Sequence, residues 1–148
     1  MMARQFCTFS VGELFLGIEV MRIQEVLRDW IITPVPTANP AIRGLINLRG
    51  QIITAVDLRT CFQIPDRDRD DAPPTILVLD GGKELLSLVV DRSGDVLEVE
   101  EECFEEPPET LKSESRRLIQ GAYKLEHSLL LVLDVNHVFD LDAATEEA

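Results

Sequence analysis

An internal repeat of short apolar segments is the feature that most constrains how this chain folds. Residues 12–27 match residues 82–97 at an offset of 70, and residues 44–58 match residues 121–135 at an offset of 77. The two offsets differ by seven residues, which one longer loop in the second half would absorb. The matched pairs are Gly12 with Gly82, Phe15-Leu16 with Leu85-Leu86, Ile18 with Leu88, Arg22 with Arg92, Glu25 with Asp95, Val26-Leu27 with Val96-Leu97, Gly44 with Gly121, Leu48 with Leu125, and Val56-Asp57-Leu58 with Leu133-Asp134-Val135.

A real repeat predicts two similar units, each a small barrel of about five strands that is too small to be stable alone. The alternative is that any strand-rich sequence matches itself by chance on Gly and Val. If the repeat holds, the chain is mainly β, and each half forms a five-stranded barrel packed side by side with its twin. We expect one domain over residues 1–148, with the first barrel mainly in 5–62 and the second mainly in 75–133.

The local pattern agrees with strands, because apolar residues occur in bursts of four to eight that are rich in Val, Ile and Leu and are separated by Gly. Residues 19–27 are ambiguous between helix and strand, and three prolines make 33–40 a loop. The clearest hairpin is 44–56, with its turn at Arg49-Gly50. The other predicted strands are 6–11, 14–18, 75–79, 84–90, 95–99, 119–125 and 128–133.

Two aspartates and two polar segments complete the prediction. Asp57 is placed to cap one helical turn that runs to Phe62, and Asp134 to cap a closing helix that runs to Leu141. Residues 63–74 read as a polar linker, and 98–120 as an acidic excursion that contains proline.

The charge of the chain argues against two classes of partner. Its 148 residues contain 27 Asp plus Glu against 14 Lys plus Arg, a formal net charge of −13. Nucleic-acid and anionic-membrane surfaces are bound largely through Lys and Arg, so neither is an expected partner. Small barrels that bind oligonucleotides also use stacking aromatics, and Trp30 and Tyr123 are the only large rings with a polar tip.

The residues that usually carry catalysis or bind metals do not form recognisable groups. The sequence contains none of the nucleophile-elbow, phosphate-loop or zinc-protease motifs. The two histidines, His127 and His137, lack paired ligands at suitable spacing, and Cys7, Cys61 and Cys103 are scattered. The aspartate run from Asp66 resembles the start of a calcium loop but fails at its sixth and twelfth positions. We therefore expect no enzyme, metal or cofactor, and the chain start, without a signal peptide or membrane span, predicts a cytoplasmic protein.

A binding protein remains, because a double barrel offers strand edges and a groove that suit other polypeptides. The opposing class is a small acidic enzyme or metal-binding protein whose residues are not recognisable from sequence.

The residues resemble the CheW-type coupling proteins of bacterial chemotaxis over nearly the whole chain, from about Gln5 to Asp140. The combination of Gly-x-x-Asn-Leu-Arg-Gly with Val-Asp-Leu-Arg carries most of this resemblance. The matching stretches are 17–20, 23–26, 42–50, 56–59, 89–91, 95–97 and 131–134.

This resemblance implies two intertwined SH3-like five-stranded barrels side by side, and a non-catalytic adaptor that links the cytoplasmic tip of chemoreceptors to the regulatory domain of the histidine kinase CheA. Related adaptors of surface or pilus motility are an alternative. Carried over, Ile23, Glu25, Arg49 and Val96 would contact the receptor in a groove between the barrels, while Arg43, Gly44 and Leu45 would lie at the barrel edge that contacts the kinase. Such a protein would be recruited to receptor arrays from the cytoplasm.

Overall fold

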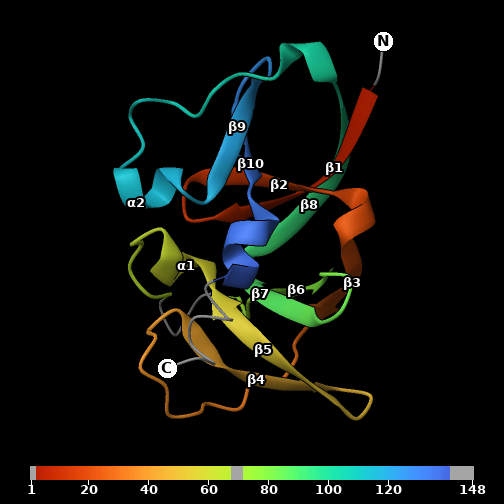
Figure 1. Cartoon of the computed structure of the whole chain (residues 1–148), viewed down its shortest axis with the longest axis vertical. Coiled ribbons are helices and arrows are strands. Elements are labelled where there is room, and N and C mark those ends of the chain that lie inside the picture. Colours follow the sequence, from red (N-terminus) through yellow and green to blue (C-terminus); the bar gives the residue numbers. More distant parts are fainter. Residues whose placement is uncertain (1–2, 68–71, 141–148) are drawn as a thin grey trace.

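Ten strands form two five-stranded sheets in the computed structural model, which describes residues 3–67 and 72–140 (Figure 1). Short helices connect the strands, and residues 135–140 are also helical. The strands are β1 (Ala3–Val11), β2 (Leu14–Glu19), β3 (Ile23–Arg28), β4 (Ile42–Leu48), β5 (Gln51–Asp57), β6 (Thr75–Asp80), β7 (Leu85–Val90), β8 (Arg92–Glu100), β9 (Ile119–Lys124) and β10 (Leu129–Leu133). The helices are η1 (Val20–Arg22), α1 (Leu58–Cys61), η2 (Glu101–Cys103) and α2 (Ser113–Arg116).

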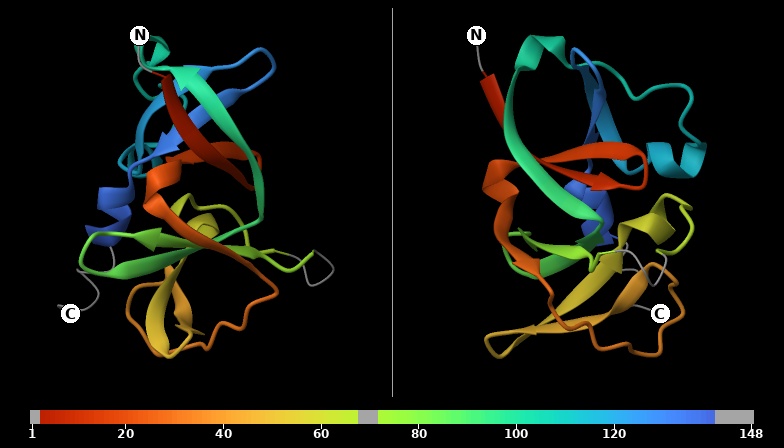
Figure 2. Two further views of the ribbon diagram at one scale, coloured as in Figure 1. Left: turned by 90° about the vertical axis from the view of Figure 1, so that its right-hand side faces the viewer. Right: turned by 180° about the vertical axis from the view of Figure 1, so that it is seen from behind.

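The two sheets make two barrels, one above the other in Figures 1 and 2. Barrel 1 has the strand order β8-β1-β2-β10-β9, and barrel 2 has the order β3-β6-β7-β5-β4. In each barrel the chain beyond the first strand of that order also pairs with the last strand, through the bridges Glu105–Ala122 in barrel 1 and Thr33–Leu45 in barrel 2. These bridges bring the two ends of each sheet together, as in a small closed barrel.

The predicted division of the chain between the barrels is wrong. Barrel 1 takes β1 and β2 from the first half of the chain and β8, β9 and β10 from the second, whereas barrel 2 takes all of β3 to β7. The chain crosses between barrels at η1, and it crosses back at the β7–β8 connection (Figures 1 and 2). The apolar pattern locates strands, but both possible partners of a strand edge satisfy it, so it does not say which edges pair.

The predicted repeat is confirmed, and it extends to the register of the strands. Exchanging β1–β5 with β6–β10 converts one strand order into the other. The pairing of Val132 with Gly17 matches that of Ala55 with Ser87 under the two offsets. Even the irregularities correspond, because the register shift between Ile42 and Gly44 recurs at the equivalent place in β9.

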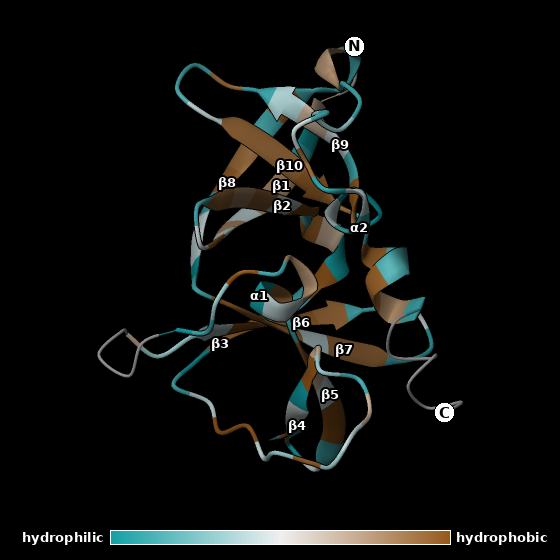
Figure 3. Cartoon of the chain, turned by 90° about the vertical axis from the view of Figure 1, so that its left-hand side faces the viewer, coloured by the Kyte–Doolittle hydropathy of each residue, from teal (hydrophilic) through white to brown (hydrophobic). Residues whose placement is uncertain are grey.

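Apolar side chains form one shared core and one smaller core inside each barrel. Figure 3 shows the apolar residues concentrated in the strands of both barrels. The shared cluster contains residues of both barrels, including Phe9, Leu16, Leu79 and Leu88. The interior of barrel 2 is lined by Leu27, Ile46, Leu48, Ile53, Ala55, Ile76, Val78 and Val89, and that of barrel 1 by Phe6, Val99, Tyr123, Leu130 and Val132. Because the largest cluster belongs to both barrels, neither barrel buries a sufficient core alone.

Several local predictions are confirmed, and others need correction. The ambiguous segment 19–27 divides into η1 and β3. The strand predicted from residue 95 begins earlier, at Arg92, because its bulge lets it continue along β1. The acidic excursion contributes the end of β8, η2 and α2. Asp57 caps α1 by accepting a hydrogen bond from the Arg59 amide, and Asp134 accepts one from the His137 amide, while Leu141 lies outside the described residues.

Within the part of the chain that the structure describes, every helix is too short or too polar to cross a membrane.

Candidate functional site

The hairpin tip between β4 and β5 presents a charged pair to solvent. Arg49 and Gly50 both have positive φ, at 53° and 89°, which gives the tight turn that a two-residue hairpin requires. The Asn47 side chain accepts a hydrogen bond of 2.9 Å from the Gly50 amide and braces the turn. The Arg49 side chain is thereby projected outward and is 71% exposed.

Arg49 and Glu25, two of the residues predicted to contact a receptor, form a two-pronged ion pair. The Arg49 Nη1 and Nη2 atoms donate to the Glu25 carboxylate at 2.9 and 2.7 Å. The hydrogen bond from Arg49 lowers the pKa of Glu25, and the reciprocal bond raises the pKa of Arg49. The pair connects the hairpin tip to β3 and leaves part of the guanidinium exposed.

The other two predicted receptor residues lie on equivalent strands of the two barrels, Ile23 on β3 and Val96 on β8. Ile23 begins β3, pairs with Leu79, and is partly buried against the shared core. Val96 lies on β8 opposite Cys7 and is 54% exposed. The register equivalent of Val96 is Val26, which is also exposed. The structure therefore brings Glu25 and Arg49 into contact and gives Val96 an open surface, while Ile23 also serves the core.

The residues predicted to contact the kinase lie in β4, and their environments differ. The Arg43 Nη1 atom donates to the Asp57 carboxylate at 2.8 Å, with 46% of the Arg43 side chain exposed. Leu45 is half-buried and exchanges main-chain hydrogen bonds of 2.8 and 2.9 Å with Thr33.

Gly44 is a glycine for an internal reason. A Cβ at this position would lie 2.2 Å from the Thr33 carbonyl oxygen, so the close backbone approach expected here is made by this chain's own 33–34 segment. Gly44 therefore has a packing role within this chain, and its contact with a kinase stays a prediction.

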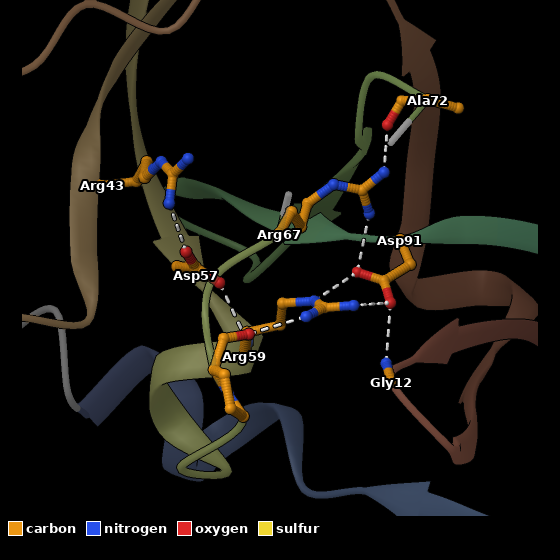
Figure 4. Close-up of polar contacts among 8 residues, drawn as sticks. Gly12, Arg43, Asp57, Arg59, Arg67, Ala72 and Asp91 are labelled. Atoms are coloured by element: carbon orange, nitrogen blue, oxygen red, sulfur yellow. Dashed lines mark hydrogen bonds and ion pairs between the residues drawn. The ribbon is translucent and has the colours of Figure 1, made fainter. Parts of the chain in front are cut away.

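A carboxylate hub at the crossing between the barrels was not predicted as a site (Figure 4). Asp91 lies between β7 and β8, and its carboxylate accepts hydrogen bonds from Arg59 at 2.7 and 2.8 Å. It also accepts from Arg67 at 2.8 Å and from the Gly12 amide at 2.7 Å. We call Asp91, Arg59, Arg67 and Gly12 the Asp91 junction.

The contacts in the Asp91 junction favour the ionised form of the Asp91 carboxylate. Burial by itself would raise the pKa of Asp91, but the hydrogen bonds from Arg59 and Gly12 outweigh burial and lower that pKa to about 2. Arg59 and Arg67 keep only 18% and 16% of their side chains exposed. The 63–74 segment, predicted to be a polar linker, is thus bound to the barrels at its beginning through Arg67.

The sequence did contain signals for the hub. Asp91 and Arg59 both fall within the motifs that carry the family resemblance, and Asp91 faces Met21 in the repeat alignment. A charged residue at a position where the other repeat has an apolar residue indicates that the two repeats make different contacts there. The strand order was needed to bring the Gly12 turn to this carboxylate.

Cys61 and the two histidines lie outside the Asp91 junction, and their contacts are those of structural residues. Burial, followed by the charge of Asp57, raises the pKa of Cys61 to about 12, so this thiol stays protonated and unreactive at neutral pH. The His137 ring lies 3.3 Å from the Asp134 carboxylate at the start of the last helix, and His127 is exposed. Among residues 3–67 and 72–140 we found no group of three or more His, Cys, Asp or Glu arranged to hold a metal ion.

Comparison with known proteins identifies the family of this fold. A family model described as the CheW-like domain matches residues 5–143. The chain is 28% identical to the chemotaxis protein CheW of Treponema pallidum (strain Nichols) over 138 residues, covering 91% of this chain and 81% of that protein. It is 29% identical to the chemotaxis protein CheW of Bacillus subtilis (strain 168), covering 92% and 86%.

A solved structure shows the same architecture. The crystal structure of the scaffolding protein TtCheW from Thermoanaerobacter tengcongensis aligns with a TM-score of 0.78 at 28% identity and covers 90% of both chains. The two intertwined barrels and the match over almost the whole sequence lead to one conclusion: this chain belongs to the CheW-like domain family.

Proposed function

We propose that this protein is a non-catalytic adaptor that couples chemoreceptors to a CheA-type histidine kinase in a bacterial chemosensory complex. The observation that carries the proposal is the match of the whole double barrel to CheW proteins, one of them solved as a scaffolding protein. An adaptor needs two docking surfaces held at a fixed separation, and two barrels joined by one core provide such a support.

The receptor surface in this proposal contains Arg49, Glu25, Val96 and Ile23. Arg49 is the anchor, because it is the most exposed member of its ion pair and its guanidinium has donors left for a partner's carboxylates or carbonyl oxygens. Val96 adds exposed apolar area, and Ile23 supports the strand that carries Glu25.

The decisive experiment compares two hairpin tips of the same protein. Arg49→Ala removes the anchor from barrel 2, and Glu126→Ala alters the equivalent position of the β9–β10 tip in barrel 1. We expect Arg49→Ala to weaken binding of a receptor-tip fragment by about tenfold, measured by calorimetry, and to lower kinase activity in reconstituted arrays. Glu126→Ala should change neither. Equal receptor affinity for Arg49→Ala and the unaltered protein would remove Arg49 from the surface.

The kinase surface in this proposal is the β4 edge, with Arg43 and Leu45 as contacts and Gly44 as the residue that lets the Thr33 segment pack beneath it. Arg43→Ala keeps the backbone of this edge and removes a half-exposed cation. The matched control is Gln120→Ala, at the equivalent exposed position of β9.

We expect Arg43→Ala to weaken binding of the CheA regulatory domain by about fivefold and to leave receptor-tip binding unchanged. A loss of affinity for both partners would instead indicate damage to the Arg43–Asp57 contact and to the fold. Titration with each partner separately and with both together also tests the adaptor proposal itself, since an adaptor must form the three-component complex.

A further inference from the structure

The Asp91 junction joins segments of both barrels through a single side chain. The Gly12 amide belongs to the β1–β2 turn of barrel 1, whereas Arg59 lies in α1 directly after β5 of barrel 2. The main-chain amide of Asp91 also donates to the Ser10 carbonyl of β1 at 3.0 Å. Asp91 therefore bonds to barrel 1 through both its backbone and its carboxylate, and to barrel 2 through Arg59.

The junction continues toward the opposite side of barrel 2. The Arg59 amide donates to the Asp57 carboxylate at 2.9 Å, and the same carboxylate accepts from Arg43 of β4 at 2.8 Å (Figure 4). One series of hydrogen bonds and ion pairs thus links β4, the strand proposed for the kinase, to the start of β8, the strand that carries Val96.

The repeat provides an internal control for this arrangement. The position equivalent to Asp91 is Met21, which is 89% exposed, and the position equivalent to Arg59 is Asn136. At this second crossing the polar contacts are made by Arg22, which donates to the Asp80 carbonyl at 3.1 Å and, more weakly, to the Asn136 side-chain oxygen at 3.5 Å. A second carboxylate with paired arginines is thus not needed for the barrels to pack, and among the described residues this arrangement is found at one of the two crossings.

The shared apolar core restrains the barrels through side-chain packing, whereas the junction adds bonds of defined direction. Apolar burial holds the barrels together, but its free energy depends mainly on area and little on direction. Hydrogen bonds between a carboxylate and a two-pronged guanidinium have narrow geometry. On this reasoning, the core holds the two barrels together, and the junction fixes their relative orientation.

We propose that Asp91 is a positioning residue that fixes the orientation of barrel 1 relative to barrel 2, and thereby sets the geometry between the two docking surfaces. The functional half of this inference rests on the adaptor proposal, while the geometric half concerns the isolated protein. The expected signature is loss of coupling with retained affinity for each separate partner.

The geometric half is tested by nuclear magnetic resonance on the isolated 16.6 kDa chain. Asp91→Asn keeps the size of the side chain but removes its charge and one acceptor oxygen. The matched control is Asp80→Asn, because the Asp80 carboxylate accepts only from the nearby Gly82 amide in the contacts described here.

Residual dipolar couplings of the backbone amides should fit one common alignment for both barrels in the unaltered protein and in Asp80→Asn. In Asp91→Asn the two barrels should require different alignments, while the couplings within each barrel remain those of the intact fold. The Gly12 amide should exchange its hydrogen at least about tenfold faster in Asp91→Asn. A single common alignment in Asp91→Asn would overturn the proposal.

The functional half is tested with a receptor-tip fragment and the CheA regulatory domain. Asp91→Asn should keep each separate affinity within about threefold and lower kinase activation in reconstituted arrays by about fivefold or more, with Asp80→Asn unchanged. Full activation by Asp91→Asn, or an equal loss of both separate affinities, would overturn the functional half. If the unaltered protein binds neither partner, the adaptor proposal fails, and the dipolar couplings still decide the role of Asp91 in barrel orientation.

Discussion

The two barrels have the same strand order and the same register but different interiors. Barrel 2 is filled by aliphatic side chains, with Ile76 and Ile46 at positions where barrel 1 has Phe6 and Tyr123. The rings of Phe6 and Tyr123 lie 5.7 Å apart, and Arg4 donates to the Tyr123 hydroxyl at 3.1 Å. Burial of Tyr123 requires that partner, whereas an isoleucine needs none. One topology thus accepts either filling when size and polar contacts are matched.

The barrels also differ at their surfaces, and there the differences bear on function. The hairpin tip of barrel 2 carries the Arg49–Glu25 pair, while the equivalent positions in barrel 1 are Glu126 and Asp95. Asp91 is a charged residue at one crossing, and the residue at the equivalent position of the other crossing, Met21, is apolar and exposed. Features that the fold needs are therefore present in both repeats, whereas the Arg49–Glu25 pair and the Asp91 contacts are each present in one.

The largest effect is expected where both barrels share the same close approach. A Cβ at Gly44 would meet the Thr33 carbonyl oxygen at 2.2 Å, and one at Gly121 would meet the Glu105 carbonyl oxygen at 2.4 Å. We expect Gly44→Ala and Gly121→Ala each to lower the free energy of unfolding by about 3 kcal/mol, measured by urea denaturation.

The control for this pair is Gly50→Ala, where φ is positive but a Cβ meets no atom within 4 Å. Its cost should be about 1 kcal/mol, from backbone strain alone. If Gly44→Ala and Gly121→Ala cost no more than this control, the closing bridges of the barrels are looser than the structure indicates.

The second effect is a difference between the two crossings in their contribution to the unfolding free energy. Asp91→Ala leaves Arg59 and Arg67 largely buried without their carboxylate and should lower the free energy of unfolding by about 2 kcal/mol. Met21→Ala, at the equivalent position, should change it by less than about 0.5 kcal/mol, because that side chain is exposed. Similar costs at both positions in urea denaturation would contradict the asymmetry.

The third effect is a dependence of the unfolding free energy on pH, which arises from Asp91 at the β7–β8 crossing. The pKa of Asp91 is about 2 in the folded protein and lies below its ordinary value of 3.8, so its ionised form stabilises the fold. This contribution is complete above about pH 4 and disappears as the pH falls through about 2.

Because solvent still reaches this carboxylate, we expect the contribution to be about 1 kcal/mol. The difference in unfolding free energy between the unaltered protein and Asp91→Asn should therefore shrink as the pH is lowered from 5 toward 2, as followed by urea denaturation at each pH. A constant difference over this range would show that the charge of Asp91 does not stabilise the junction.

The smallest effect concerns the two hairpin tips. Arg49 and Glu126 both project into solvent, and exposed ion pairs contribute little to folding. Arg49→Ala and Glu126→Ala should therefore leave the urea midpoint unchanged, which makes Arg49→Ala a clean probe of binding. A lowered midpoint for Arg49→Ala alone would mean that its pair with Glu25 holds the β4–β5 hairpin in place.

Part of the candidate site was predictable from residue patterns. The positive-φ turn at Arg49-Gly50 and the cap at Asp57 follow from local chemistry, so their side chains lie where the sequence places them. The contact of Arg49 with Glu25 could not be predicted in this way, because β3 and the β4–β5 tip meet only through the closed barrel. Gly44 shows the same limit, since its close neighbour turned out to be Thr33 of this chain.

The amino-acid sequence by itself determined the strand positions, the turns and the two-fold repeat, because apolar alternation and turn residues act over neighbouring positions. Only the tertiary structure decided that the repeats exchange strands and that Asp91 gathers Arg59, Arg67 and Gly12 into one junction. The physical reason is that main-chain hydrogen bonds at a strand edge are the same for every partner. The choice among edges depends on burying one common core, to which both halves of the chain contribute together.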